Sequence, residues 1–212
     1  MIARAMWRNA LLLSAFAAVT TGMVVAFNQL TASRIEASRQ QELVKTLNAL
    51  TPPGSYDNDL LRDALPLPDA ARLGHTVPET AWRAFRGGRV VAVLYPVIAR
   101  DGYSGRIRLL VAVGADGRLA GVRVLAHRET PGLGDAIEVE KSDWIHAFDG
   151  KSLSDPRESG WKVRKDGGQF DQFSGATITP RAVVSAVHEA LRYFQDHRQS
   201  LLAHAQAIPE TP

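Results

Sequence analysis

The residue types and spacing best suited to chemistry occur late in the chain, in the order Asp-x-x-Ser-Gly-Ala-Thr. The residues that define this pattern are Asp171, Ser174, Gly175, Ala176 and Thr177. Serine, glycine and alanine are small, so this stretch leaves the backbone open to a bulky group. A helix that starts just after it has free amide donors in its first turn, and such a helix start binds phosphate well. The pattern therefore indicates a phosphate site, although an ordinary loop with a serine or threonine helix cap accounts for the same residues.

A second candidate segment, residues 127–135, reads His-Arg-Glu-Thr-Pro-Gly-Leu-Gly-Asp. Its proline and two glycines let the backbone approach a flat ligand, and its polar groups can hydrogen-bond the edge of a ring. Tyr103 lies in a Gly-Tyr-Ser-Gly turn between two predicted strands, where its ring can stack on such a ligand. Both segments also have an interpretation without a ligand, as a surface turn with a solvated histidine and as a turn anchored by its tyrosine.

The composition excludes several kinds of chemistry. The chain of 212 residues has no cysteine, which removes iron–sulfur clusters, thiolate metal sites, cysteine nucleophiles and dithiol redox chemistry. Any electrons that the protein handles must therefore reside on another carrier. The six histidines are scattered, and without a catalytic triad or a carboxylate pair in view we expect neither a metal site nor a catalytic residue. The net charge of +3 is spread along the chain, which argues against nucleic-acid binding.

The first motif resembles the flavin attachment motif of the FMN-binding domain family, Asp-x-x-Ser/Thr-Gly-Ala-Thr, and every defining position is present. In that family a flavin transferase, using FAD and magnesium, esterifies the final threonine with the phosphate of FMN. The resemblance implies that Thr177 carries FMN through a phosphoester. It also implies that the transferase recognises Asp171. Close approach to the phosphate is then the role of Ser174, Gly175 and Ala176.

The second segment is similar to the His-x-Glu-Thr-Pro-Gly-Leu-Gly stretch found in the family of G subunits of Rnf (Rsx) electron transport complexes, and the two motifs follow in that family's order. The resemblance implies that Glu129, Thr130 and Leu133 line a flavin pocket, with Tyr103 as a further candidate. It implies an anchored flavoprotein that relays electrons through its FMN, among the other subunits of the complex. That complex couples electron transfer between ferredoxin and NAD to ion translocation.

Three alternatives remain open from the sequence. The C subunit of the sodium-pumping NADH:quinone reductase shares the attachment motif and a single anchor, but its resemblance is weaker over residues 127–135. A free-standing anchored flavin reductase would have a substrate of its own. A ligand-binding or scaffold module would carry no flavin.

The amino terminus predicts a membrane anchor. Arg4 and Arg8 precede a run without charge, and residues 10–30 are long and apolar enough for a transmembrane helix. A cleaved signal peptide is the alternative, but the apolar sequence continues to Phe27, which favours an uncleaved anchor. The positive-inside rule then puts residues 1–9 in the cytoplasm and the main domain on the periplasmic side of a bacterial inner membrane. One span without charge offers no path for an ion, so translocation must run through partner subunits.

The rest of the chain predicts an α+β fold in which an FMN-binding domain with a central, mainly antiparallel sheet and packed helices follows the anchor. Residues 31–88 are interpreted as a stalk or linker and the first part of the outer domain, and the prolines after Thr51 end the stalk helix. The FMN-binding domain is expected over residues 89–198, with its sheet beginning near Arg89.

Within this domain, residues 90–98 predict a buried strand, and residues 106–126 predict a hairpin with an Asp-Gly turn. A closing helix from about Pro180 to His197 is expected, with Thr179 as its cap. Residues 199–212 are expected to form a flexible tail.

Overall fold

The computed structural model describes residues 2–203, and the chain falls into two compact units, Met1–Lys45 and Thr46–Pro212. The first unit consists of most of helix α1 (Ile2–Leu50). The helix has no proline, and as expected it ends where Thr51 precedes Pro52. Its stretch Met6–Ala32 is long and apolar enough to cross a membrane, and it contains the predicted span. The hydroxyl of Thr20 donates to the Phe16 carbonyl at 2.9 Å, so this polar group is satisfied within the helix.

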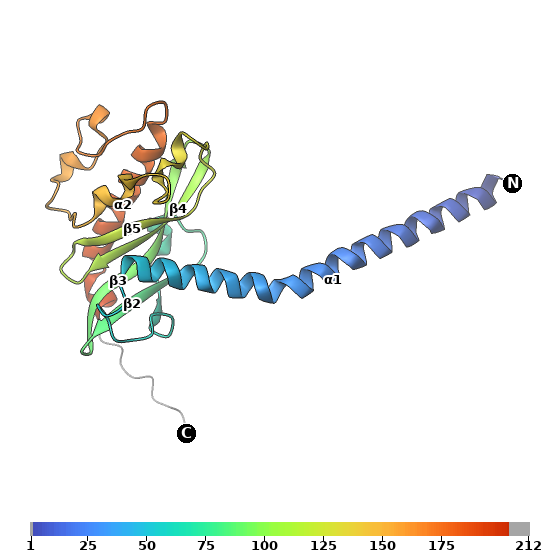
Figure 1. Ribbon diagram of the computed structural model, residues 1–212, viewed down its shortest axis with the longest axis horizontal. Helices are drawn as coiled ribbons and strands as arrows, with labels where there is room; N and C mark the ends of the chain where they lie inside the picture. The colour runs from blue at the N-terminus through green and yellow to red at the C-terminus, as the bar shows by residue number, and fades with distance from the viewer. Residues whose placement is uncertain (1, 204–212) are drawn as a thin grey trace, which may run out of the picture. The chain divides into compact units, whose positions relative to one another are not determined.

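The second unit is built on a five-stranded antiparallel sheet whose strand order follows the chain (Figure 1). The strands are β1 (Ala64–Pro66), β2 (Thr80–Arg86), β3 (Arg89–Gly102), β4 (Gly105–Gly114) and β5 (Leu119–Ala126). The predicted hairpin is confirmed as β4 and β5, and the predicted buried strand lies within β3. The α+β class is confirmed.

The expected start of the sheet at Arg89 is wrong, because β1 and β2 precede it and β2 pairs with β3. The burial of β2 is not evident from its sequence. Arg83 is only 9% exposed, and its guanidinium lies 5.2 Å from the centre of the Phe85 ring. Its Nη1 donates to the Ala203 carbonyl at 2.9 Å. From the sequence alone an arginine is expected at the surface. In the fold its aliphatic stem can be buried while its guanidinium is bonded.

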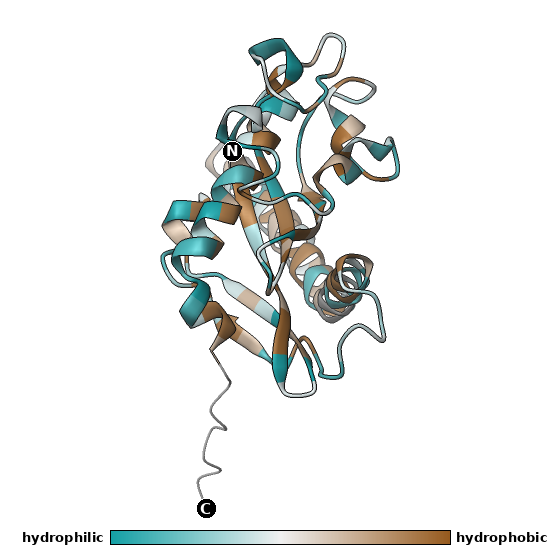
Figure 2. Ribbon diagram, turned by 90° about the vertical axis from the view of Figure 1, so that its left-hand side faces the viewer, coloured by the Kyte–Doolittle hydropathy of each residue, from teal (hydrophilic) through white to brown (hydrophobic). Residues whose placement is uncertain are grey.

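Helix α2 (Ile178–Asp196) covers one face of the sheet, contacting β3 and β4. Alternate residues of β3, such as Val93 and Tyr95, join the buried face of α2 in the main core. Hydrophobic residues run along the strands, whereas the loops are largely hydrophilic (Figure 2). At β5, Leu50 in the last turn of α1 approaches Gly121 so closely that an added Cβ would lie 2.8 Å from the leucine Cδ2. The second unit thus includes the end of α1.

Short 3-10 helices connect β5 to α2 and are held by clustered aromatic rings. They are η2 (Gly134–Ile137), η3 (Asp143–Phe148), η4 (Glu158–Gly160) and η5 (Arg164–Asp166), and η1 (Ala70–Leu73) precedes β2. The aromatic cluster includes Trp144, Phe148, Trp161, Phe170 and Phe173. This packing fixes the long connection that leads to the attachment motif.

The chain after α2 departs from the expected flexible tail. Residues Arg198–Leu202 form helix α3, and the side chain of Leu201 is fully buried. Burial of one leucine contributes about 1.5–3 kcal/mol, which helps to hold this helical turn against the core. The remainder of the predicted tail, residues 204–212, lies outside the described residues.

Candidate functional site

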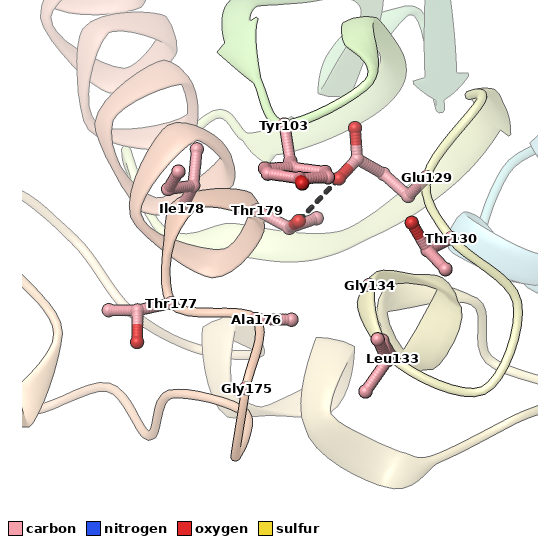
Figure 3. A pocket seen from close by; sticks show the side chains of 10 residues that line it. All are labelled: Tyr103, Glu129, Thr130, Leu133, Gly134, Gly175, Ala176, Thr177, Ile178 and Thr179. Atoms are coloured by element: carbon pink, nitrogen blue, oxygen red, sulfur yellow. Dashed lines mark hydrogen bonds between the residues drawn. The ribbon is translucent and has the colours of Figure 1, made fainter.

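A cavity of about 290 Å³ lies where three segments of the second unit meet. Tyr103 comes from the turn between β3 and β4, one group of residues comes from the loop after β5, and another comes from the start of α2 (Figure 3). The lining residues are Tyr103, Glu129, Thr130, Leu133, Gly134, Gly175, Ala176, Thr177, Ile178 and Thr179. The volume is near the lower end of the range for small-molecule sites. Seven of the nine predicted site residues are therefore brought together, from segments far apart in the sequence.

Glu129 connects the three segments of the cavity. Glu129 is only 4% exposed. Its Oε1 accepts a hydrogen bond of 3.0 Å from the backbone N–H of Ser104, in the β3–β4 turn. Its Oε2 accepts a short hydrogen bond from the hydroxyl of Thr179 in α2, drawn as the dashed line in Figure 3. One buried carboxylate thus fixes the turn, its own loop and the helix start relative to one another.

Two glycines make room for this carboxylate. A Cβ on Gly134 would lie 2.9 Å from the Thr179 Oγ1 and 3.0 Å from the Glu129 Oε2. A Cβ on Gly102 would lie 2.9 Å from the Glu129 Oε1 and 2.3 Å from the Gly105 carbonyl oxygen. Because such distances are below ordinary van der Waals contact, the loop can approach α2 and the β3–β4 turn only with glycine at these positions.

Thr179 does not have the capping role that its sequence predicts. Helix α2 begins at Ile178, and Thr177 occupies the capping position without a cap hydrogen bond from its side chain. Thr179 lies inside the first turn, fully buried, with its hydroxyl bonded to Glu129. The hydroxyl bonds the carboxylate because hydrogen bonds to a charged acceptor are stronger than those to neutral groups. Pro180 still fits the first turn, where its missing N–H has no partner to lose.

The hydroxyls of Thr177 and Thr179 therefore have different environments. Thr177 is partly exposed, makes no side-chain bond to the helix, and points away from the Glu129–Thr179 pair (Figure 3). The first turn of α2 contains no acidic side chain. Its free N–H groups and the positive end of the helix dipole favour an anion beside Thr177. This donor set fits a phosphodiester on the Thr177 oxygen.

Asp171 and Ser174, which the sequence also predicts as site residues, do not line the cavity. Both are exposed. The Asp171 carboxylate pairs with Arg164 at 3.0 Å, and its backbone carbonyl accepts the indole N–H of Trp144 at 2.8 Å. These contacts tie the beginning of the attachment motif to the aromatic cluster rather than to the cavity.

Sequence reasoning missed Ile178, whose side chain lines the cavity and is 44% exposed. Tyr103 and Leu133 are also large apolar residues that are exposed beside the cavity. An exposed isoleucine next to a helix-capping position was the available signal, because isolated apolar residues at a helix start have no core to fill. Together the three side chains give the cavity an apolar rim suited to a flat ring system.

His127 supports the loop from outside the cavity. Its Nδ1 accepts the backbone N–H of Glu129 at 3.0 Å, so this nitrogen carries no proton. The proton is then on Nε2, which lies 2.8 Å from the Glu138 Oε1. The imidazole thus orients the residue that bridges the three segments.

No group of three or more potential metal ligands occurs among residues 2–203. The cavity itself offers hydroxyls, a carboxylate, backbone donors and an apolar rim.

Comparison with known proteins defines the class first. Residues 102–192 match the family model of the FMN-binding domain, which contains the whole cavity lining. Residues 1–50, which include the apolar helix, match the model described as the RnfG N-terminal region.

Relatives with these features align over nearly the full chain. The G subunit of the ion-translocating oxidoreductase complex of Pseudomonas aeruginosa is 54% identical over 96% of this chain and 95% of its own length. The corresponding proteins of Shewanella piezotolerans and Vibrio cholerae, which have the same name, are 45% and 46% identical. They cover 94% and 95% of this chain and the same shares of their own lengths. The chain belongs to the family of G subunits of ion-translocating oxidoreductase complexes, as its motifs predict.

Proposed function

We propose that this chain is a membrane-anchored electron-relay subunit that carries FMN in a phosphoester bond to Thr177. The observation that carries the proposal is the partly exposed Thr177 hydroxyl, which makes no cap bond and stands at a helix start beside the cavity. FMN, when bound, supplies reversible acceptance and release of electrons, and the chain has no cysteine for an iron–sulfur or dithiol carrier.

Different residues around Thr177 bind different parts of FMN. The N–H groups at the start of α2 bind the phosphodiester anion. Tyr103, Leu133 and Ile178 exclude water from the ring system by providing apolar contacts. Glu129 and Thr130 supply polar groups for its hydrogen-bonding edge. Gly175, with a φ of 79°, adopts a left-handed conformation that other residues rarely take, and this turn brings the motif to the cavity.

Attachment requires a flavin transferase that uses FAD. The Thr177 oxygen forms a bond to the phosphorus on the FMN side of FAD, the pyrophosphate bond breaks, AMP leaves and the hydroxyl proton is released. A magnesium ion on the transferase stabilises the charge that develops on phosphorus. Asp171 and Ser174 are exposed and outside the cavity, which makes them accessible to the transferase. Thr179 is fully buried and hydrogen-bonded, which favours Thr177 as the acceptor.

The chain works within a membrane complex. Arg4 and Arg8 precede the apolar stretch, so the amino terminus faces the cytoplasm and the flavin domain lies in the periplasm, anchored in the bacterial inner membrane. The other subunits provide electron donors and acceptors, and they conduct the ion whose movement is coupled to electron transfer between ferredoxin and NAD. The curated relatives are named as G subunits of an ion-translocating oxidoreductase complex. These names favour this role over that of a quinone reductase C subunit or a free-standing reductase.

The test is co-expression of the full chain with a flavin transferase, followed by a denaturing gel under ultraviolet light and mass analysis of tryptic peptides. We expect a fluorescent band and a mass increase of one FMN less one water on the peptide of residues 166–181. Thr177→Ala should abolish both signals, whereas Thr177→Ser should retain them because it keeps a hydroxyl. Thr179→Val removes the neighbouring hydroxyl together with one donor to Glu129, so its band should be weaker but still fluorescent. A fluorescent Thr177→Ala band would overturn the assignment.

A further inference from the structure

Glu129 has a feature that lining a pocket does not require: it is a buried ionisable group without a cationic partner among residues 2–203. Within the described lining of the cavity there is no lysine, arginine or histidine. The donors to the Glu129 carboxylate are a backbone N–H from Ser104 and the hydroxyl of Thr179, both of them neutral. Neutral dipoles weaken the field of such a charge, but they do not cancel it, because they carry no opposite net charge.

The charged groups nearby are engaged elsewhere. Lys141 donates to the buried Asp135 at 2.9 Å, and neither residue lines the cavity. His127 contacts the loop through an unprotonated Nδ1 and faces Glu138 with its other nitrogen. Arg128 is adjacent in sequence, but it is exposed and not part of the lining.

The hydrogen bonds to Glu129 match the acceptors of a carboxylate. Each of its two oxygens accepts one hydrogen bond, and bonds to a charged acceptor are stronger than bonds between neutral groups. One of the donors, Thr179, lies in the first turn of α2, so the carboxylate also lies at the positive end of the helix dipole. Local structure thus holds a negative charge in place without neutralising it.

We propose that the Glu129 carboxylate is a fixed negative charge that lowers the reduction potential of the flavin bound in this cavity. The inference rests on the proposed function, because it needs a flavin in the cavity. Reduction adds electron density to the bound group, and a like charge in the same partly desolvated cavity opposes this addition. The protein is thereby tuned to give up electrons more readily than an uncharged cavity would allow.

The direct test compares Glu129→Gln with the wild type in the full, flavinylated chain in detergent. Glutamine keeps the size and a hydrogen-bonding end but removes the charge. We expect the midpoint potential, measured by spectroelectrochemical titration, to rise in this variant. The matched control Glu140→Gln removes the same charge from an exposed position of the same connection and should leave the potential unchanged. An unchanged potential in Glu129→Gln overturns the proposal.

A second pair of variants covers the case in which Glu129→Gln does not fold. Thr130 lies next to Glu129, lines the cavity and is exposed, so it accepts longer side chains. Thr130→Lys brings a positive charge towards the carboxylate, and Thr130→Met adds similar length without charge. The potential of the lysine variant should exceed that of the methionine variant, and equal potentials contradict the proposal. Absence of covalent flavin in the wild type would instead contradict the proposed function, so the two failures are distinct.

Discussion

A buried carboxylate needs hydrogen-bond donors, and at Glu129 these donors come from residues distant in the sequence. Ser104 precedes it by 25 positions and Thr179 follows it by 50. The position of each partner is set by a glycine that permits close approach, Gly102 at the β3–β4 turn and Gly134 in the loop. The geometry of the cavity is therefore sensitive to single atoms added at these glycines.

Gly134→Ala tests this sensitivity. The new Cβ would lie within 3.0 Å of Glu129 and Thr179 atoms, so the loop must move away from α2. Overpacking of this kind costs about 1–3 kcal/mol, so we expect the free energy of unfolding in urea to fall by that amount. We also expect less fluorescent flavin per chain, because the loop lines the cavity. Arg128→Ala, an exposed change in the same loop, is the control and should stay within about 0.5 kcal/mol of the wild type.

At the scale of single residues, the sequence predicts the lining well and the hydrogen bonds poorly. Thr177, Glu129 and Leu133 are found from their motifs, and the structure brings them to one cavity. The capping role of Thr179 is wrong because capping rules consider only nearby backbone. The partner that decides its orientation, Glu129, is 50 positions away. Long-range polar pairs of this kind leave no periodic signal in a single sequence.

Among the elements, α2 contacts the connection before it partly through a stacked imidazole. His188 on α2 stacks on Trp161 with ring centres 5.1 Å apart and planes 10° apart. Burial lowers the pKa of His188 below 6.5, although the nearby Glu158 carboxylate opposes this shift. The folded protein therefore prefers the neutral ring at this position.

This preference predicts a pH dependence of stability. Since the pKa of His188 is lower in the folded than in the unfolded chain, the unfolded chain binds more protons between the two values. Stability is then fully present above pH 6.5 and decreases as the pH falls from 6.5 through the folded pKa. In His188→Phe, which keeps an aromatic ring without a titratable group, urea unfolding should show a smaller loss of stability between about pH 7 and about pH 5. Equal losses in both proteins would contradict this account.

The elements themselves are predictable where local patterns are strong. The apolar helix, β3 and the hairpin follow from composition, periodicity and an Asp-Gly turn. Strand β2 and helix α3 do not, because each depends on a tertiary contact. Arg83 is buried by Phe85 and Ala203, and α3 is held by Leu201. Neither contact can be read from neighbouring residues.

At the scale of the whole chain, the absence of cysteine makes membrane topology directly measurable. A single cysteine can be introduced at Ala3, before the apolar stretch, or at Lys165 in the flavin domain, and both positions are exposed. In intact cells a membrane-impermeant maleimide should label Lys165→Cys, whereas Ala3→Cys should be labelled only after the membrane is disrupted. The reverse pattern would contradict the periplasmic placement of the domain.

The sheet joins each strand to its neighbour in the chain, yet the cavity needs both the turn after β3 and the start of α2. A growing polypeptide can therefore complete its strands early, while the acceptor hydroxyl reaches its final surroundings only after α2 has docked. With FMN attached to Thr177 as proposed, covalent flavin would mark finished molecules, and chains that stall before this last step would be colourless.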